Sequence, residues 1–294
     1  MPQILIAVKP TTGTKDSTLV FDSGSGELTI YELRKGEPVT ISVRNKEKKH
    51  CQGWYDIAAH QNYPCEAGNL VDAKFDSCYV CRRKTDFNPG FYNSSTISAK
   101  QSAYNAKPHS VYIAYFGNEL YKAGIQSDSR GLDRLFEQGA LYYSIIERAK
   151  NAYEAHELEA KLIAQGLRNS VTKKQKQDSY ETLYRLDDAE IEHAFRRKVH
   201  ELRLTDDLQI HTNLDIFFFD NRPTEPITTI HTETISGKVR GIVGNYLVVE
   251  NGNRLFGLWL RPRNPLTSPA LLPWQYGHKH KHYVIPTKVS AAFA

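Results

Sequence analysis

The amino-acid sequence predicts an α+β protein in which two β-rich segments flank a mixed core. Three observations carry this prediction: short alternating apolar runs toward both ends, longer helix-like stretches that stop at glycine near the middle, and cysteines confined to positions 51–81. At 294 residues, 40% of them hydrophobic, the chain can bury a sizeable core. The expected parts are a β-rich module with a four-cysteine zinc site at 1–105, a core at 106–172, a charged helical linker at 173–210 and a β-rich module at 211–294.

Residues 1–50 are typical of a small β module. Four runs have strand composition and are bounded by the turn sequences SGSGE and RKGEP: QILIAV, STLVF, ELTIYEL and PVTISV. The opening MPQILIAV lacks a basic leader and a small-residue cleavage signal, so it predicts a strand and not a secretion signal.

The four cysteines predict a metal site. Cys51 and Cys65 are followed by Cys78 and Cys81, which form a CxxC pair, and four thiolates complete a closed tetrahedral zinc site. Such a structural zinc would stabilise a turn-rich segment and leave no open position for catalysis. Two disulfides or a redox CxxC are the alternatives, and the lack of a secretion signal disfavours them. His50 or His60 remains a possible substitute ligand.

The stretch 109–125 predicts two paired strands around the turn Gly117-Asn118. Tyr112 and Lys122 would then project from neighbouring strands onto a shared face. Two helices are expected next, RGLDRLFEQGA ending at Gly139 and ERAKNAYEAHELEAKLIAQG ending at Gly166. Glu159 lies beside the apolar stripe of the second.

These residues resemble the GIY-YIG nuclease superfamily over about 60 residues of the chain. Ser110-Val111-Tyr112 falls where the superfamily has its first tripeptide, and Lys122-Ala123-Gly124 falls where it has the second. Ser110 replaces a glycine and Lys122 replaces a tyrosine. The match continues with Arg134 on the following helix, EAKLI from Glu159 on a late helix, and Asn169 beyond it.

The whole chain also resembles an uncharacterised prokaryotic family, a domain of unknown function. That resemblance lies in the cysteine segment, in YIAYFGNELYKAGI and in SGKVRGIVGNYLVVENG. It implies an architecture but no activity.

The superfamily resemblance implies a small antiparallel sheet with helices and a metal-dependent phosphodiester hydrolysis of DNA or RNA. Glu159 would hold a catalytic Mg²⁺ or Mn²⁺, Arg134 the scissile phosphate, and Tyr112 would be the general base or water orienter. Lys122 would depress the pKa of Tyr112 or contact the phosphate. Further candidate nucleic-acid contacts are Arg130, Asn169, Lys173 and Lys174.

Each of these residues also has an ordinary structural interpretation. Tyr112 is a common strand aromatic, Arg134 pairs easily with neighbouring acids on a helix, and Glu159 sits on an acidic helix face. For Arg130 the surface interpretation is favoured over that of a phosphate-binding arginine. The alternative function is therefore a catalytically degenerate nucleic-acid-binding or protein-interaction module stabilised by zinc.

The last third of the chain predicts a charged region followed by a compact β-barrel or antiparallel sheet. Lys173, Lys174 and Lys176 are expected in a flexible basic linker, and SGKVRGIVGNYLVVENGNRLFGLWLR alternates strands with glycine turns. The basic and aromatic residues of this region form either a surface that binds the backbone of nucleic acid or an ordinary charged surface. The candidate residues are Arg240, Arg254, Arg261, Arg263, Tyr246 and Trp259. In the tail, the candidate metal ligands are His278, His280 and His282.

Composition favours a cytoplasmic protein without a membrane partner, while nucleic acid is the partner that the superfamily resemblance implies. The formal net charge is +5 and the pI is about 8.8, which permits nucleic-acid binding without establishing it. No apolar run reaches membrane-spanning length. Phosphate-loop, HExxH and GxSxG motifs are missing from the sequence. The oligomeric state is not indicated.

Overall fold

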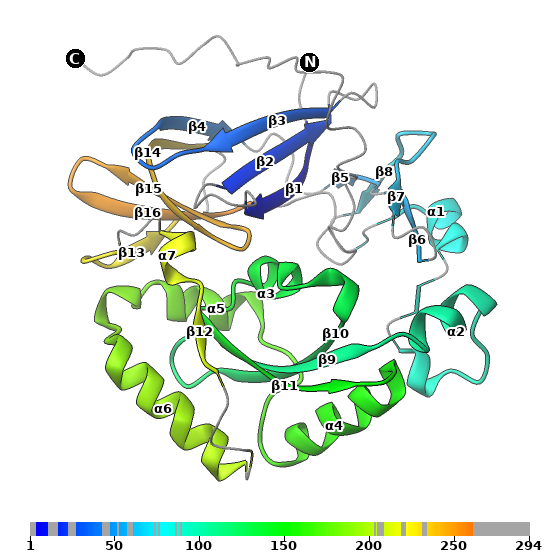
Figure 1. Ribbon diagram of the computed structural model, residues 1–294. Helices are drawn as coiled ribbons and strands as arrows, with labels where there is room; N and C mark the ends of the chain where they lie inside the picture. Colours follow the sequence, from blue (N-terminus) through cyan, green and yellow to red (C-terminus); the bar gives the residue numbers. More distant parts are fainter. Residues whose placement is uncertain are drawn as a thin grey trace.

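The predicted α+β class is confirmed (Figure 1). The computed structural model describes residues 4–10, 17–22, 28–42, 48–51, 53–57, 61–72, 75, 77–85, 87–88, 90–202, 204, 209–218, 222–230 and 234–260. Within these residues the strands form a four-stranded central sheet, a five-stranded sheet, a three-stranded sheet and two small two-stranded pairs.

The central sheet has the strand order β10-β9-β11-β12, and its pairings are antiparallel. Its strands are β9 (His109–Tyr115), β10 (Tyr121–Ser127), β11 (Tyr142–Ala149) and β12 (His211–Thr212). Every residue of β9 is buried, because helices cover both faces of the sheet. Helix α3 (Asp133–Gln138) lies on one face and helix α4 (Ala152–Ala164) on the other.

Alternation along β9 divides the core between these two faces. Val111 and Ile113 pack in the cluster that contains Ala155 and Leu162 of α4, while Tyr112 packs with Leu135 of α3. Odd and even positions of a strand point to opposite faces, so the continuous apolar run of β9 serves two separate layers.

The helix boundaries follow local capping signals. Asn151 begins α4, because its side chain accepts hydrogen bonds from the backbone N–H groups of Tyr153 and Glu154, both at 2.9 Å. Gly139 ends α3 in the left-handed conformation with a φ of 73°. The longer predicted helix is wrong at its start, since residues 147–149 belong to β11 and pair with β9.

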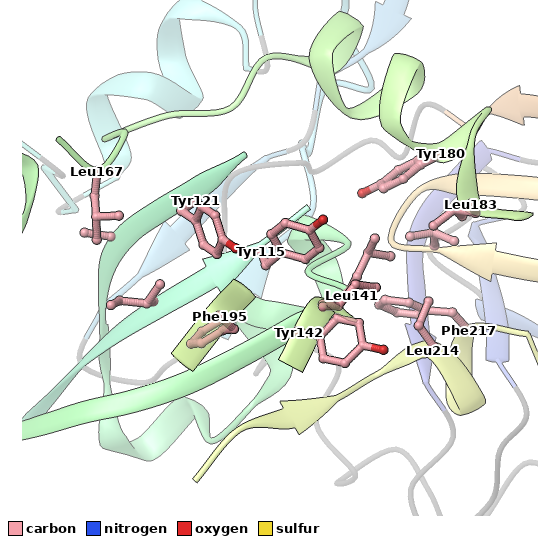
Figure 2. Packing of buried hydrophobic residues seen from close by; sticks show 14 of the residues in the cluster. Tyr115, Tyr121, Leu141, Tyr142, Leu167, Tyr180, Leu183, Phe195, Leu214 and Phe217 are labelled. Carbon is pink, nitrogen blue, oxygen red and sulfur yellow. The ribbon is translucent and has the colours of Figure 1, made fainter. Parts of the chain in front are cut away.

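The charged region after the core is packed and not a flexible linker. It contains α5 (Lys173–Tyr180), the 3₁₀ turn Leu183–Arg185 and α6 (Asp188–Glu201), and a capping box at Thr172 begins α5. Tyr180 and Phe195 are fully buried and join the main cluster beside Tyr115 and Tyr121 (Figure 2). Burying such aromatic side chains stabilises the fold by about 1.5–3 kcal/mol each.

The five-stranded sheet joins one early strand to four strands from the last part of the described chain. Its order is β13-β16-β15-β14-β4, with bounds Ile227–Thr229, Arg254–Trp259, Tyr246–Asn251, Thr234–Val243 and Pro38–Ser42 respectively. Val39 is buried with Val239 and Leu247 between these strands. In the described residues this sheet is open, which corrects the barrel-like expectation. Strand β4, expected in the N-terminal module, is an edge strand here.

The remaining elements lie around these two sheets. The three-stranded antiparallel sheet consists of β1 (Ile4–Pro10), β2 (Ser17–Asp22) and β3 (Leu28–Leu33). The cysteine segment holds the pairs β5 (Lys48–His50) with β8 (Leu70–Asp72) and β6 (Trp54–Asp56) with β7 (Gln61–Tyr63), followed by α1 (Tyr79–Lys84). The short helical elements are the 3₁₀ turns Phe91–Asn93 and Asp128–Arg130, α2 (Ala99–Asn105) and α7 (Leu214–Phe217).

The five-stranded sheet docks on the end of α3 through a tight turn. Gly244 has a φ of 58°, and a Cβ there would lie 2.7 Å from the carbonyl oxygen of Glu137. Tyr180 supports the same contact by donating its hydroxyl to the carbonyl of Gly139 at 2.7 Å. The predicted domain boundaries stay predictions, but these elements share one hydrophobic cluster. No helix in the described ranges is long and apolar enough to cross a membrane.

We predict that Gly124→Ala destabilises the protein by about 1–3 kcal/mol, as expected for an overpacked core. Gly124 pairs with Tyr112 across β9 and β10, and an added Cβ would lie 2.4 Å from the phenol ring. Chemical denaturation measures the change. Gly90→Ala is the matched control, because its nearest neighbour would lie at an ordinary 3.5 Å. Equal stability of the two variants would contradict the prediction.

Candidate functional site

Tyr112 is the centre of a polar cluster between the central sheet and α3. Its side chain is fully buried, and its hydroxyl accepts hydrogen bonds from Gln138 Nε2 at 2.9 Å and from Arg134 Nε at 3.3 Å. Arg134 and Gln138 are four residues apart on α3, so they project from the same side of the helix. Tyr112 and Arg134, two of the predicted site residues, are therefore in direct contact.

Lys122 reaches the same cluster from the neighbouring strand. It lies opposite Ala114 in the register of β9 and β10, which puts it on the face of Tyr112 as the alternation predicts. Its Nζ donates to Gln138 Oε1 at 2.7 Å. Gln138 thus connects Lys122 to Tyr112 through both ends of its side-chain amide.

The charges around Tyr112 favour its phenolate form. Burial acts to raise the pKa of Tyr112, but the charges of Arg134 and Lys122 and the hydrogen bonds from Gln138 and Arg134 outweigh it. The pKa of Tyr112 consequently lies below that of an ordinary tyrosine. Burial alone would lower the pKa of Arg134, yet its proximity to Tyr112 raises it, so the guanidinium keeps its charge.

Two members of this cluster were not predicted as part of the site. Gln138 precedes the helix-ending Gly139, and Lys176 was expected in the flexible linker. Lys176 instead extends from α5, donates its Nζ to the carbonyl of Gln138 at 2.5 Å and lies 4.6 Å from the ring centroid of Phe116. Burial, aided by the charge of Lys122, lowers the pKa of Lys176 to about 7. The sequence contained one signal for Gln138: it lies four residues after Arg134, so the two side chains share one side of a helix.

Glu159 lies apart from this cluster. It belongs to α4, which packs on the Val111 face of the sheet and not on the Tyr112 face. Its Oε2 lies 3.3 Å from His156 Nδ1, and the His156 ring stacks on Tyr92 with centroids 3.7 Å apart. The structure therefore separates the predicted metal ligand from Tyr112, Lys122 and Arg134, and a Mg²⁺ held by Glu159 does not fit the Tyr112 cluster.

The remaining nucleic-acid candidates are dispersed. Asn169 is exposed and follows a backbone bridge between Arg168 and Lys122, so its segment runs beside β10. Lys173 Nζ lies 5.0 Å from the ring centroid of Trp259, and Lys174 pairs with Asp178 at 2.6 Å. The backbone of Arg130 lies in a 3₁₀ turn, but its side chain is outside the described part.

The backbone-binding surface suggested for the five-stranded sheet is not formed by its aromatic residues. Tyr246 is fully buried and packs against Trp259, with ring centroids 5.0 Å apart, so it offers no exposed stacking face. Arg240 pairs with Glu250 at 3.5 Å, and Arg254 is exposed. The other basic and histidine candidates lie outside the described residues: Arg261, Arg263, His278, His280 and His282.

The predicted clustering of the four cysteines is confirmed. The Sγ atoms of Cys51, Cys65, Cys78 and Cys81 all lie within 4.8 Å of one another. A tetrahedral zinc with bonds of about 2.3 Å separates its sulfur ligands by roughly 3.8 Å, so the cluster is consistent with a bound zinc. The four cysteines form no disulfide, and the 4.0 Å between the Cys65 and Cys78 sulfurs is far beyond the length of a disulfide bond.

Backbone geometry directs the cysteine side chains inward. Gly53 has a φ of 83°, and a Cβ there would lie 1.8 Å from the carbonyl oxygen of Tyr63. This turn aims the Gly53 N–H at Cys51 Sγ at 3.4 Å, and the Cys78 N–H donates to the same sulfur at 3.0 Å. Such N–H groups support the negative charge of a metal-bound thiolate.

The pKa values of the thiols differ within the cluster. Burial raises the pKa of Cys51 and of Cys81. Burial acts in the same direction on Cys78, but hydrogen bonds from the Asn69 side chain and the Cys81 backbone lower its pKa to about 6. His50 is not among the clustered ligands, and His60 lies outside the described residues.

We predict that Lys176→Met weakens the pH dependence of stability between about pH 7 and 10. The folded amine has a pKa of about 7 against 10.5 for an ordinary lysine, so the unfolded chain binds the extra proton in this window. Stability of the wild type should therefore rise with pH, and the variant should lose part of that rise. Denaturation at a series of pH values measures it. Lys174→Met on the same helix is the control, and identical slopes for wild type and Lys176→Met would refute the expectation.

Comparison with known proteins identifies the family of the chain. A search of curated proteins and a search of solved structures each found no significant match. A family described as "Protein of unknown function (DUF2797)" matches residues 39–258, which is most of the chain and includes both the cysteine cluster and the Tyr112 cluster. The matched range begins in β4 and ends in β16, two strands of the same sheet. The chain therefore belongs to the DUF2797 family.

Proposed function

We propose that the chain binds the phosphodiester backbone of nucleic acid at the Tyr112 cluster and hydrolyses it there. The observation that carries this proposal is the convergence of Lys122, Arg134 and Lys176, from three different elements, on the hydrogen-bonded pair formed by Tyr112 and Gln138. Gathering three cations in a half-buried position costs free energy unless an anion offsets their repulsion. A phosphate group supplies that anion.

The chemistry of the cluster suits a phosphodiester. Arg134 brings a permanently charged guanidinium with several donors, and Lys122 contributes a compact ammonium. Lys176, with a pKa of about 7, gains its proton readily when an anion approaches. Tyr112, with a lowered pKa, is a better proton acceptor near neutral pH than an ordinary tyrosine. It would orient or deprotonate the attacking water.

A divalent metal would add stabilisation of negative charge on the phosphate. The resemblance to GIY-YIG nucleases assigns that metal to Glu159, which the α4 packing keeps on the other side of the sheet. Glu159 therefore takes no part in the proposed hydrolysis at the Tyr112 cluster.

A second function has specific support. Tyr112 is fully buried, and its hydroxyl already has two donors, so an attacking water has no access without movement of α3 or α5. Together with the position of Glu159, this favours a catalytically degenerate module that binds nucleic acid or another partner.

For the cysteine cluster we propose a structural zinc. Four thiolates fill the coordination sphere, and among the described residues between 48 and 85 the regular elements are three-residue strands and one six-residue helix. Metal binding would supply the folding free energy that this small core lacks.

We predict that the protein cleaves labelled DNA or RNA in the presence of a divalent metal. Arg134→Gln should lower the cleavage rate by at least about a hundredfold, which is typical of losing an electrostatic contact to the transition state. Single- and double-stranded substrates with Mg²⁺ or Mn²⁺ form the assay. A second variant, Glu159→Gln, tests the metal ligand that the GIY-YIG resemblance implies. Its matched control is Glu192→Gln, which removes an exposed carboxylate paired with Arg196 on α6.

The pattern of loss separates the candidates. Loss in both Arg134→Gln and Glu159→Gln supports the full GIY-YIG assignment. Loss only in Arg134→Gln keeps the nuclease and moves the metal away from Glu159. A wild type that binds nucleic acid without cutting it, in any tested metal, supports the degenerate module.

We predict about one zinc per chain in purified protein, lost or strongly reduced in Cys81→Ser. Metal analysis by mass spectrometry measures the content, and limited proteolysis after chelation should cut first between residues 48 and 85. The central sheet should remain protected. Reduced, carefully purified protein that holds no zinc would overturn the structural-zinc proposal.

A further inference from the structure

The cysteine segment carries the most exposed large apolar side chains of the described chain. Tyr79 is 65% exposed and Val80 is 56% exposed, and both lie in the first turn of α1. Leu70 and Phe75 of the same segment are also exposed. Several large apolar side chains exposed to solvent in one segment are typical of an interaction surface.

The cysteine cluster itself forces these residues outward. Cys78 caps the start of α1 and Cys81 is buried within it, so the side of the helix bearing these two residues faces the other cysteines. Tyr79 and Val80, which lie between them, are left on the solvent side. Figure 1 draws α1 at the edge of the molecule.

Cations lie directly over the exposed rings. The guanidinium of Arg82 lies 4.8 Å from the ring centroid of Phe75, and that of Arg83 lies 5.8 Å from the ring centroid of Tyr79. Arg83 Nη1 also donates to the Tyr79 hydroxyl at 3.4 Å. Lys84 follows in the same turn and pairs with Glu66 at 3.1 Å. The last turn of α1 is therefore basic and lies beside two exposed aromatic residues.

We propose that this face of the cysteine segment binds single-stranded nucleic acid. We call it the α1 surface and define it by Phe75, Tyr79, Val80, Arg82 and Arg83. Unpaired bases stack on Tyr79 and Phe75, and phosphates pair with the two arginines, which is the combination that sequence-tolerant single-strand binders use. The charge of the surface selects a polyanion over an apolar protein groove. The inference rests on the proposed function, because it names the form of nucleic acid that the chain binds and a second contact region for it.

Fluorescence anisotropy with labelled single-stranded DNA and RNA of mixed sequence tests the α1 surface in the full-length, zinc-loaded chain. Tyr79→Ala should weaken binding roughly five- to hundredfold, the range for losing one stacked base. Arg82→Gln combined with Arg83→Gln should flatten the slope of log affinity against log salt by about 1.4, as expected for two phosphate contacts on a single strand.

The chain offers a matched control on another element. Arg185 lies 5.1 Å from the ring centroid of Tyr184 and donates its Nε to the Tyr184 hydroxyl at 2.7 Å, which reproduces the arginine-on-tyrosine arrangement far along the sequence. Tyr184→Ala with Arg185→Gln should leave affinity and salt slope unchanged. Zinc content is measured for each variant. If Tyr79→Ala loses its metal, the test of the α1 surface rests on the variant that combines Arg82→Gln with Arg83→Gln.

The outcomes separate this inference from the proposed function. Weaker binding in the α1 variants with full affinity in Lys122→Met supports the α1 surface and contradicts phosphate binding at Tyr112. Loss only in Lys122→Met overturns the α1 surface and leaves the Tyr112 site standing. A wild-type protein that binds no single-stranded nucleic acid overturns the inference and leaves a protein as the partner for this face. The inference is likewise overturned if the α1 variants bind with an affinity within twofold of wild type.

Discussion

The double-sided burial of β9 is the constraint on which the rest of this structure depends. A central strand with no exposed residue requires a layer on each face, and α3 and α4 supply those layers. Because strand residues alternate, one layer receives Val111 and Ile113 and the other receives Tyr112. The second layer therefore contains a phenol that must be hydrogen-bonded, since a buried hydroxyl without a partner is costly. Arg134 and Gln138 meet that requirement, and Arg134 adds its charge to a layer that Lys122 also enters.

The proposed site follows from this constraint more than from any single motif residue. Gln138 binds Tyr112 with its amide nitrogen, Lys122 with its amide oxygen and Lys176 with its backbone carbonyl. One short helix thus fixes three groups from three other elements. The close approach of Gly124 to the Tyr112 ring gives a steric reason for glycine in the Lys122-Ala123-Gly124 tripeptide. That reason is independent of any resemblance to nucleases.

Local patterns in the sequence were sufficient for the hairpin, for the ends of α3 and α4 and for the cysteine cluster. Each of these depends on neighbours close in sequence: alternation in β9, Gly139 after α3, Gly166 after α4 and the Cys78–Cys81 spacing. Tertiary contacts decided the remainder. Residues 147–149 have helical composition but pair with the free edge of β9, and Lys176 carries the composition of a linker but docks over Phe116. Glu159 has the expected helix and spacing, yet the face on which α4 packs could not be read from spacing alone.

The pairing of β4 with β14 has a consequence for how the chain is made. Thr40 and Ser236 hydrogen-bond across this pair at 2.9 Å although 196 positions separate them in sequence. Contacts of such long range are slow to form, because the intervening chain must be closed into a loop first. During synthesis β4 leaves the ribosome long before β14 exists. The edge of β4 that pairs with β14 must therefore stay without that partner, or be shielded by a chaperone, until β14 has been translated.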